Sequence, residues 1–172
     1  MSLKVWNASS AGVLLRMMRV NDLDAVVRIQ REAYGDDYQE SAEVLGHKLR
    51  LAPEACWFAE YEGVGLGYVF AHPWAAGVPR LHAPIAHIPS NADHGFLHDL
   101  AVSPRARGAG VGGRLFERVR MWSRGAGHSA LGLVALADAV AYWRALGFVA
   151  QPLSPPKGYG EGAVFMRRYS GD

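Results

Sequence analysis

Arg107-Gly108-Ala109-Gly110-Val111-Gly112-Gly113 is a glycine-rich turn between an apolar run at residues 96–102 and a helix-period segment that continues to about residue 124. Glycine lets the backbone adopt positive φ angles and lets a ligand approach the chain closely. The first N–H groups of the following helix have no acceptor within it, and the helix dipole favours negative charge there. The stretch therefore predicts a site for a phosphate-bearing cofactor.

Positive charge is concentrated in and just after this turn, at Arg105, Arg107, Arg114, Arg118, Arg120 and Arg124. Most of these side chains are expected on a solvated helix face. Arg105 and Arg107 lie at the turn itself, where a guanidinium can form paired hydrogen bonds to a phosphate. The formal net charge of the whole chain is only +2, which argues against a general nucleic-acid binder.

The composition predicts one cytoplasmic domain over residues 1–172, with residues 1–12 as a disordered or short extra N-terminal segment. Half of the residues are hydrophobic (50%), enough for a sizeable core. No apolar stretch approaches the roughly 20 residues of a membrane span, and no signal-peptide pattern is present. The lone cysteine, Cys56, cannot form an internal disulfide, which fits a reducing compartment.

Hydrophobic periodicity and turn residues predict an α/β domain with a mixed sheet, in the order β-α-α-β-β-β-α-β-α-β-β. His98 and Asp99 lie in the strand before the glycine turn, on opposite faces if the strand alternates regularly. Between residues 72 and 95, four prolines are expected to break any regular element. The predicted strands cover residues 13–18, 56–61, 66–70, 96–102, 131–137, 148–150 and 163–166, and the predicted helices cover 22–34, 41–51, 110–124 and 139–146.

Two other phosphate motifs are excluded by spacing. Gly108, Gly110 and Gly113 match Gly-x-Gly-x-x-Gly, the dinucleotide-binding fingerprint, but residues 103–107 separate them from the strand. In that fingerprint the first glycine ends the strand directly, and an acidic residue closes the next strand. Here that strand ends in Leu-Ala, and no Gly-Lys-Ser/Thr is present for a nucleotide-hydrolase loop.

Two segments resemble the hallmarks of the GNAT superfamily, the acyl-CoA-dependent N-acyltransferases. Residues 100–104, followed by Arg107, Gly110 and Gly112, are similar to its signature Gln/Arg-x-x-Gly-x-Gly/Ala. Residues 139–148, which end in Leu-Gly-Phe, resemble its second hallmark, a short helix at the usual separation. The element order matches over residues 13–166.

This resemblance implies a mixed, mostly antiparallel sheet with splayed middle strands, flanked by helices, and acetyl-CoA as co-substrate between those strands. It implies direct attack of an amine on the thioester, and thus an N-acetyltransferase for a small-molecule or peptide amine. The alternative is a non-catalytic acyl-CoA-binding module. No metal is expected, and a homodimer stays open. The expected cofactor-binding residues are Leu100, Ala101, Val102, Arg107, Gly108, Ala109, Gly110, Val111, Gly112, Gly113 and Trp143.

One departure concerns the acid that protonates the leaving thiolate. In the superfamily a tyrosine usually stands five residues before the phenylalanine of Leu-Gly-Phe, and here that position is Trp143. Tryptophan has no titratable proton. Tyr142 is adjacent but turned by about 100° on the helix. Tyr159 is the alternative acid, or the acid is dispensable because thiolate is a fair leaving group.

His98 and Asp99 are the candidates for the base that takes the amine proton. An imidazole suits base chemistry near neutral pH, although a packed strand histidine is an equal alternative. Asp99 is expected as a structural or acceptor-orienting carboxylate.

The acceptor pocket is expected between residues 72–95 and 152–162, because binding residues concentrate on loops of a rigid scaffold. Its candidate lining side chains are Trp74, His82, His87 and Tyr159. The segment between the first two predicted helices carries an acidic patch, and in the superfamily that segment borders the acceptor site. The patch is formed by Asp36, Asp37, Glu40 and Glu43, which fit either a solvated loop or a cationic acceptor.

Overall fold

The computed structural model describes residues 12–171, so the prediction for residues 1–12 lies, except for Gly12, outside the described residues. The predicted element order and mixed sheet are confirmed. The strands are β1 (Leu14–Met17), β2 (Trp57–Tyr61), β3 (Val64–Trp74), β4 (His94–Val102), β5 (Ala130–Ala135), β6 (Val149–Ala150) and β7 (Val164–Tyr169). The helices are α1 (Leu23–Tyr34), α2 (Ala42–Leu51), α3 (Val111–Gly125) and α4 (Val140–Ala145).

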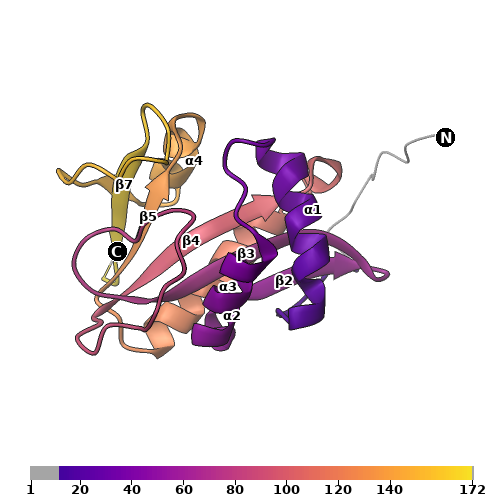
Figure 1. The fold of residues 1–172 in the computed structure, drawn as a ribbon, viewed down its shortest axis with the longest axis horizontal. Coiled ribbons are helices and arrows are strands. Elements are labelled where there is room, and N and C mark those ends of the chain that lie inside the picture. Colours follow the sequence, from indigo (N-terminus) through magenta and orange to yellow (C-terminus); the bar gives the residue numbers. More distant parts are fainter. Residues whose placement is uncertain (1–11, 172) are drawn as a thin grey trace.

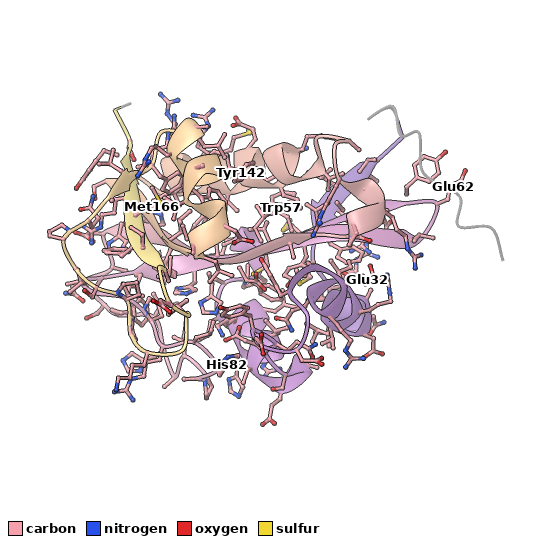
Figure 2. The ribbon with its side chains drawn as sticks, turned by 90° about the horizontal axis from the view of Figure 1, so that it is seen from above. Glu32, Trp57, Glu62, His82, Tyr142 and Met166 are labelled. Atoms are coloured by element: carbon pink, nitrogen blue, oxygen red, sulfur yellow. The ribbon has the colours of Figure 1, made fainter. Side chains whose placement is uncertain are left out.

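The strands form one seven-stranded sheet in the order β1-β2-β3-β4-β5-β7-β6. All neighbours are antiparallel except β4 and β5. Helices α1 and α2 lie on one face of this sheet, and α3 and α4 lie on the other (Figures 1 and 2). Two buried apolar clusters follow from this layering, one around α3 and one around α1 and α2.

Local sequence explains where the first two helices begin and end. Helix α1 stops at Gly35, whose φ of 68° is a conformation that glycine adopts without a Cβ penalty. The Ser41 hydroxyl caps α2 by accepting a hydrogen bond from the Val44 N–H. The connection between them, residues 35–41, is therefore short and fixed at both ends, which positions the side chains that it carries.

Strand β3 extends further than its sequence suggests. It continues through Pro73 to Trp74 and pairs with β4 as far as His94, so the expectation that Pro73 breaks the strand is wrong. The last residue of β3 that pairs with β2 is Val69. Beyond it β3 has a free edge, where a strand tolerates proline.

The two central strands separate shortly after they meet. Strands β4 and β5 pair only at Gly95↔Leu131 and Phe96↔Gly132, and the rest of β5 pairs with β7. The predicted splay of the middle strands is thus present. It leaves one side of β4 without a strand partner from about residue 97 onward.

No helix within residues 12–171 is long and apolar enough to cross a membrane.

Candidate functional site

A cleft of about 640 Å³ occupies the space between the separating ends of β4 and β5. Residues 97–102 of β4 form one wall, and residues 133–139, in and after β5, form the other. The end of α1, the connection to α2, helix α4 and the loop before β7 also line it, together with Leu81 and Arg107. Segments that are far apart in sequence therefore meet at this one opening.

The main chain of β4 faces this cleft at Leu100 and Val102. The backbone N–H of Ser103 donates to the Leu66 carbonyl (2.8 Å). Leu66 and Ser103 are therefore a hydrogen-bonded pair of the β3–β4 ladder. Such pairs alternate with pairs whose N–H and C=O groups point away from each other. In this register Leu100 and Val102 belong to the second kind. Their main-chain groups point away from β3, into the space that β5 has left.

The glycine turn lies at one end of the cleft, and its geometry suits a bound phosphate. Gly108 (φ 82°) and Gly110 (φ 73°) have left-handed backbone conformations, and no atom lies within 4 Å of where their Cβ atoms would be. Gly110 is the N-cap of α3, and no side chain caps the helix there. The first N–H groups of α3 therefore lack an acceptor within the helix. The exposed Arg107 lines the cleft, whereas Arg105 lies 3.8 Å from Glu32.

A β-bulge brings His98 and Asp99 to the same side of the sheet. On β3, Phe70 lies opposite Asp99, and the next residue, Ala71, lies opposite Leu97. His98 therefore has no partner on β3 and is the extra residue of the bulge. The side chains of His98 and Asp99 both bond to groups on the α1–α2 side. The expectation that they lie on opposite faces is wrong, because a bulge interrupts the alternation of a strand.

His98 belongs to a buried charge network with Glu40 and Lys48. The His98 Nε2 lies 3.0 Å from one oxygen of the Glu40 carboxylate, and the Lys48 Nζ lies 2.9 Å from both oxygens. The backbone N–H of His82 also donates to this carboxylate (2.8 Å). The side chains of His98, Glu40 and Lys48 are at most 2% exposed. Since Nε2–H donates to Glu40, the Nδ1 of a neutral His98 carries the free lone pair, and Nδ1 is buried without a hydrogen-bond partner.

The electrostatics of this network favour an ionised Glu40. Burial alone would raise the pKa of Glu40, but the charges and hydrogen bonds of His98 and Lys48 outweigh it and lower this pKa to about 2. Burial lowers the pKa of Lys48, against the opposing attraction of Glu40. Glu40 is therefore not part of a solvated loop, whereas Asp36, Asp37 and Glu43 are exposed.

Sequence reasoning missed Lys48, although a signal existed. On α2 the buried residues are Leu45, Gly46, Lys48 and Leu49, so the lysine lies on the apolar face of the helix. A lysine is rarely buried without a charged partner. That rule could have indicated a buried carboxylate near α2, but only the fold identifies it as Glu40.

His72 is a buried neutral neighbour of His98. Their ring centroids are 6.0 Å apart. Burial, together with the nearby His98 and Lys48, lowers the pKa of His72 to about 3. Its Nδ1 lies 3.0 Å from the Pro73 carbonyl, which can only accept, so Nδ1 carries the proton. His72 therefore adds no positive charge beside His98.

Asp99 lies between two tyrosine hydroxyls. The Tyr34 hydroxyl is 3.0 Å from one carboxyl oxygen, and the Tyr68 hydroxyl is 2.6 Å from the other. The Tyr34 hydroxyl is also 2.6 Å from the Leu100 carbonyl. Burial raises the pKa of Asp99 more than the hydrogen bonds of Tyr68 and Tyr34 and the charge of His98 lower it. Neither tyrosine was singled out by sequence, since their partners are more than thirty positions away.

The aromatic residues of the second hallmark take different positions. Trp143 is 7% exposed and packs edge-on against Phe116 and Phe148, while also lining the cleft. Tyr142 is 45% exposed and lines the cleft as well. Its hydroxyl lies 3.4 Å from where a Cβ on Gly112 would be. In Figure 2, Tyr142 lies on α4, on the opposite side of the sheet from His82.

The two long loops meet at the other end of the cleft. The Tyr159 hydroxyl is buried and donates to the Pro79 carbonyl (2.9 Å). Tyr159, Glu161 and Leu81 line the cleft, but Trp74, His82 and His87 do not. Of the four side chains expected to line an acceptor pocket, only Tyr159 lines this cleft. Trp74 is part of β3, and His82 and His87 lie on the loop between β3 and β4.

Comparisons with known proteins identify the family and the fold. The family described as "Acetyltransferase (GNAT) family" matches residues 23–148. Among curated proteins, none matches the chain in sequence. Ard1 from Thermoplasma volcanium is similar in structure, with a TM-score of 0.74 and 18% identity, covering 92% of this chain and 98% of that one.

Two further solved structures are similar over almost their whole length. The loading GNATL domain of CurA from Lyngbya majuscula has a TM-score of 0.75 and 14% identity, covering 92% of this chain and 98% of that one. The PaiA N-acetyltransferase from Thermoplasma acidophilum, in complex with coenzyme A, has a TM-score of 0.69 and 13% identity, covering 91% of this chain and 98% of that one. At these identities the likeness concerns the fold. The family match spans more than half of the chain, and the chain therefore belongs to the acetyltransferase (GNAT) family.

Proposed function

We propose that this protein is an N-acetyltransferase that moves the acetyl group of acetyl-CoA to an amine of a small molecule or peptide. One observation carries the proposal. The cleft runs from the glycine turn, along the edge of β4 at Leu100 and Val102 that β5 leaves unpaired, to the buried pair His98 and Asp99. An anion site, an unpaired strand edge and titratable groups thus follow one another along a single opening.

The phosphate end suits coenzyme A. The N–H groups between Arg107 and Gly113 would hold the pyrophosphate, and Arg107 would add its charge. The main-chain groups of Leu100 and Val102 would bind the pantetheine and the thioester, with Ala101 between them and Trp143 along the wall. When bound, acetyl-CoA supplies a thioester carbonyl as the electrophile.

His98 is the proposed base. Its Nε2–H donates to Glu40, which leaves Nδ1 to accept a proton, as in other sites where a carboxylate orients an imidazole. Glu40 is a poor base itself, because its pKa is about 2. The side chain of His98 is fully covered (0% exposed), so an amine in the cleft would pass its proton through one bridging water, a reach that general bases use.

Tyr159 is the proposed wall of the acceptor end. Its hydroxyl proton is engaged by the Pro79 carbonyl, and burial raises its pKa above the ordinary tyrosine value. It therefore stays protonated and positions the two loops. Glu161, exposed at the same end, would favour a cationic acceptor. Structural relatives support a peptide as one kind of acceptor: a NatC complex is bound to a Gag peptide and CoA, and a Naa20 structure contains a bisubstrate analogue.

A non-catalytic acyl-CoA-binding module is the second candidate, and Trp143 favours it, because it replaces the tyrosine that usually protonates the thiolate. A thiol-release assay separates the two. We expect the protein to release free CoA from acetyl-CoA with at least one member of a panel of dipeptides, monoamines and diamines, and mass spectrometry to find the acetylated amine. Binding of acetyl-CoA without thiol release across the panel would favour the second candidate.

A further inference from the structure

The hydrogen bonds around Asp99 require three protons, but the two tyrosine hydroxyls beside an ionised Asp99 would supply only two. Three oxygen–oxygen contacts are present: Tyr34 to the Leu100 carbonyl (2.6 Å), Tyr34 to Asp99 (3.0 Å) and Tyr68 to Asp99 (2.6 Å). Each contact needs one proton, and each tyrosine hydroxyl has only one. A carbonyl has none. If each contact is a separate hydrogen bond, the third proton comes from Asp99.

The shortest contacts show where each proton lies. The Leu100 carbonyl can only accept, so the 2.6 Å contact uses the proton of Tyr34. The Tyr34 oxygen is then an acceptor toward Asp99, and the carboxyl oxygen 3.0 Å away must donate. The other carboxyl oxygen accepts from Tyr68. Asp99 is thereby a neutral carboxylic acid with every oxygen partnered.

We propose that Asp99 is held as a carboxylic acid and, through the Tyr34 hydroxyl, supplies the proton that the departing CoA thiolate takes up. This inference rests on the proposed function. It assigns the acid role to groups on β4 and α1, in place of the α4 tyrosine that Trp143 has replaced.

The position of Tyr34 supports this delivery. Its hydroxyl bonds the Leu100 carbonyl, one of the main-chain groups that face the cleft. The Leu100 N–H faces the same side of the strand, because both main-chain groups of a strand residue point the same way. If that N–H binds the thioester, the Tyr34 hydroxyl lies beside the reacting carbon. Tyr34 also lines the cleft directly.

The proton balance closes within the site. As the amine nitrogen bonds to the thioester carbon and its proton passes to His98 Nδ1, the carbon–sulfur bond breaks and its electron pair stays on sulfur. The sulfur takes the Tyr34 proton, and Tyr34 takes the Asp99 proton. A proton then passes from His98 to Asp99, its neighbour on the bulge, through water in the cleft. The amide and free CoA thiol are the only products.

The charges around Asp99 are compatible with a neutral acid. From α2, Lys48 attracts a negative Asp99, as does a protonated His98 from β4. Glu40, from the connection between α1 and α2, opposes the ionisation of Asp99. Lys48 forms its own ion pair with Glu40 at 2.9 Å. Asp138, beyond β5, adds negative charge near Tyr34. Burial then favours the uncharged form of Asp99 and of both tyrosines.

The protonation state can be measured directly with Asp99→Asn. Asparagine has nearly the same shape, its NH₂ can donate to Tyr34 and its carbonyl can accept from Tyr68, so the fold and melting temperature should change little. We expect the infrared difference between the wild-type protein and D99N at neutral pH to show the carbonyl band of a protonated carboxylic acid. A carboxylate band in its place would overturn the inference, whether or not the protein acetylates amines.

Delivery of the proton is tested by kinetics with the same variant. We expect D99N to lower kcat by about 10²-fold or more, the usual range for a lost proton donor, with KM for acetyl-CoA nearly unchanged. Tyr34→Phe should lower kcat similarly. The control is Tyr169→Phe, which changes an exposed tyrosine outside the cleft and should leave kcat unchanged.

Unchanged kcat in D99N, or a loss of kcat confined to Tyr142→Phe, would overturn the proposed proton delivery. Absence of thiol release from the wild-type protein would instead overturn the proposed function and the delivery with it, while the infrared band still decides the state of Asp99.

Discussion

The two ends of the cleft are built in opposite ways. The glycine turn at residues 107–113 offers backbone N–H groups, open space above Gly108 and Gly110, and an exposed arginine. The other end holds a glutamate, a lysine and a histidine that are almost completely buried and depend on one another. A cofactor used by many enzymes can be held by backbone geometry alone, whereas proton transfer needs side chains whose charge is set by burial. Substitutions should therefore block binding at the first end, and slow chemistry or unfold the protein at the second.

The largest expected effect is at the glycine turn. Gly110→Asp should abolish the rise in melting temperature that acetyl-CoA produces as a ligand of the folded state. The aspartate would be strained at φ 73° and would repel the phosphates. Gly112→Asp should act similarly, by filling space near Tyr142.

Gly77→Asp is the matched control for this test. Gly77 also has a positive φ (91°) and nothing near its Cβ position, but it lies on the loop after β3 and outside the cleft lining. It should keep the full acetyl-CoA shift. If Gly110→Asp and Gly112→Asp also keep it, the cofactor does not bind at this turn.

The next effect concerns the chemistry at the other end. His98→Ala should lower kcat by roughly 10²–10⁴-fold, the range for a lost general base. The affinity for acetyl-CoA should stay nearly unchanged, because the glycine turn is separate from His98. Turnover of the amine is the measurement, with the acetyl-CoA melting shift as the check on folding. Normal turnover in His98→Ala would show that His98 is a structural residue and not the base.

The same contrast explains what the sequence could predict. The turn at residues 107–113 is contiguous, so its strand, glycines and helix are visible within one short window. The charge network joins Glu40, Lys48 and His98, which meet only because β4 packs under α1 and α2. The bulge at His98 adds one residue to an otherwise regular strand, and no single-residue signal marks it. Contiguous motifs were therefore predictable, and contacts across the fold were not.

Stability gives a third test, at the buried ion pair. Glu40→Gln should destabilise the fold by about 3–5 kcal/mol, because it leaves the Lys48 ammonium buried without its counter-charge. Lys48→Met in the Glu40→Gln background should restore much of this loss. Urea unfolding of the two single variants and the double variant measures the coupling. Simple additivity of the two single effects would show that the pair is not coupled.

The pH dependence of that stability follows from Glu40. Its pKa in the folded protein is about 2, below the value of about 4.3 in an unfolded chain. The stabilisation is thus present above about pH 4 and is lost as the pH falls through the folded pKa. The stability difference between the wild-type protein and Glu40→Gln should narrow on acidification over this range. A difference that stays constant down to pH 2 would mean that folding does not lower the pKa of Glu40.

The smallest expected effect is at Tyr159, where the two loops meet. Tyr159→Phe removes one buried hydrogen bond to the Pro79 carbonyl, which should lower stability by about 1 kcal/mol. Because Tyr159 lines the acceptor end of the cleft, the variant should raise KM for the amine while the acetyl-CoA melting shift stays the same. A loss of acetyl-CoA binding in Tyr159→Phe would contradict the separation of the two ends. If neither KM nor stability changes, the acceptor must contact the connection between α1 and α2 instead, where Tyr38 packs against Gly160.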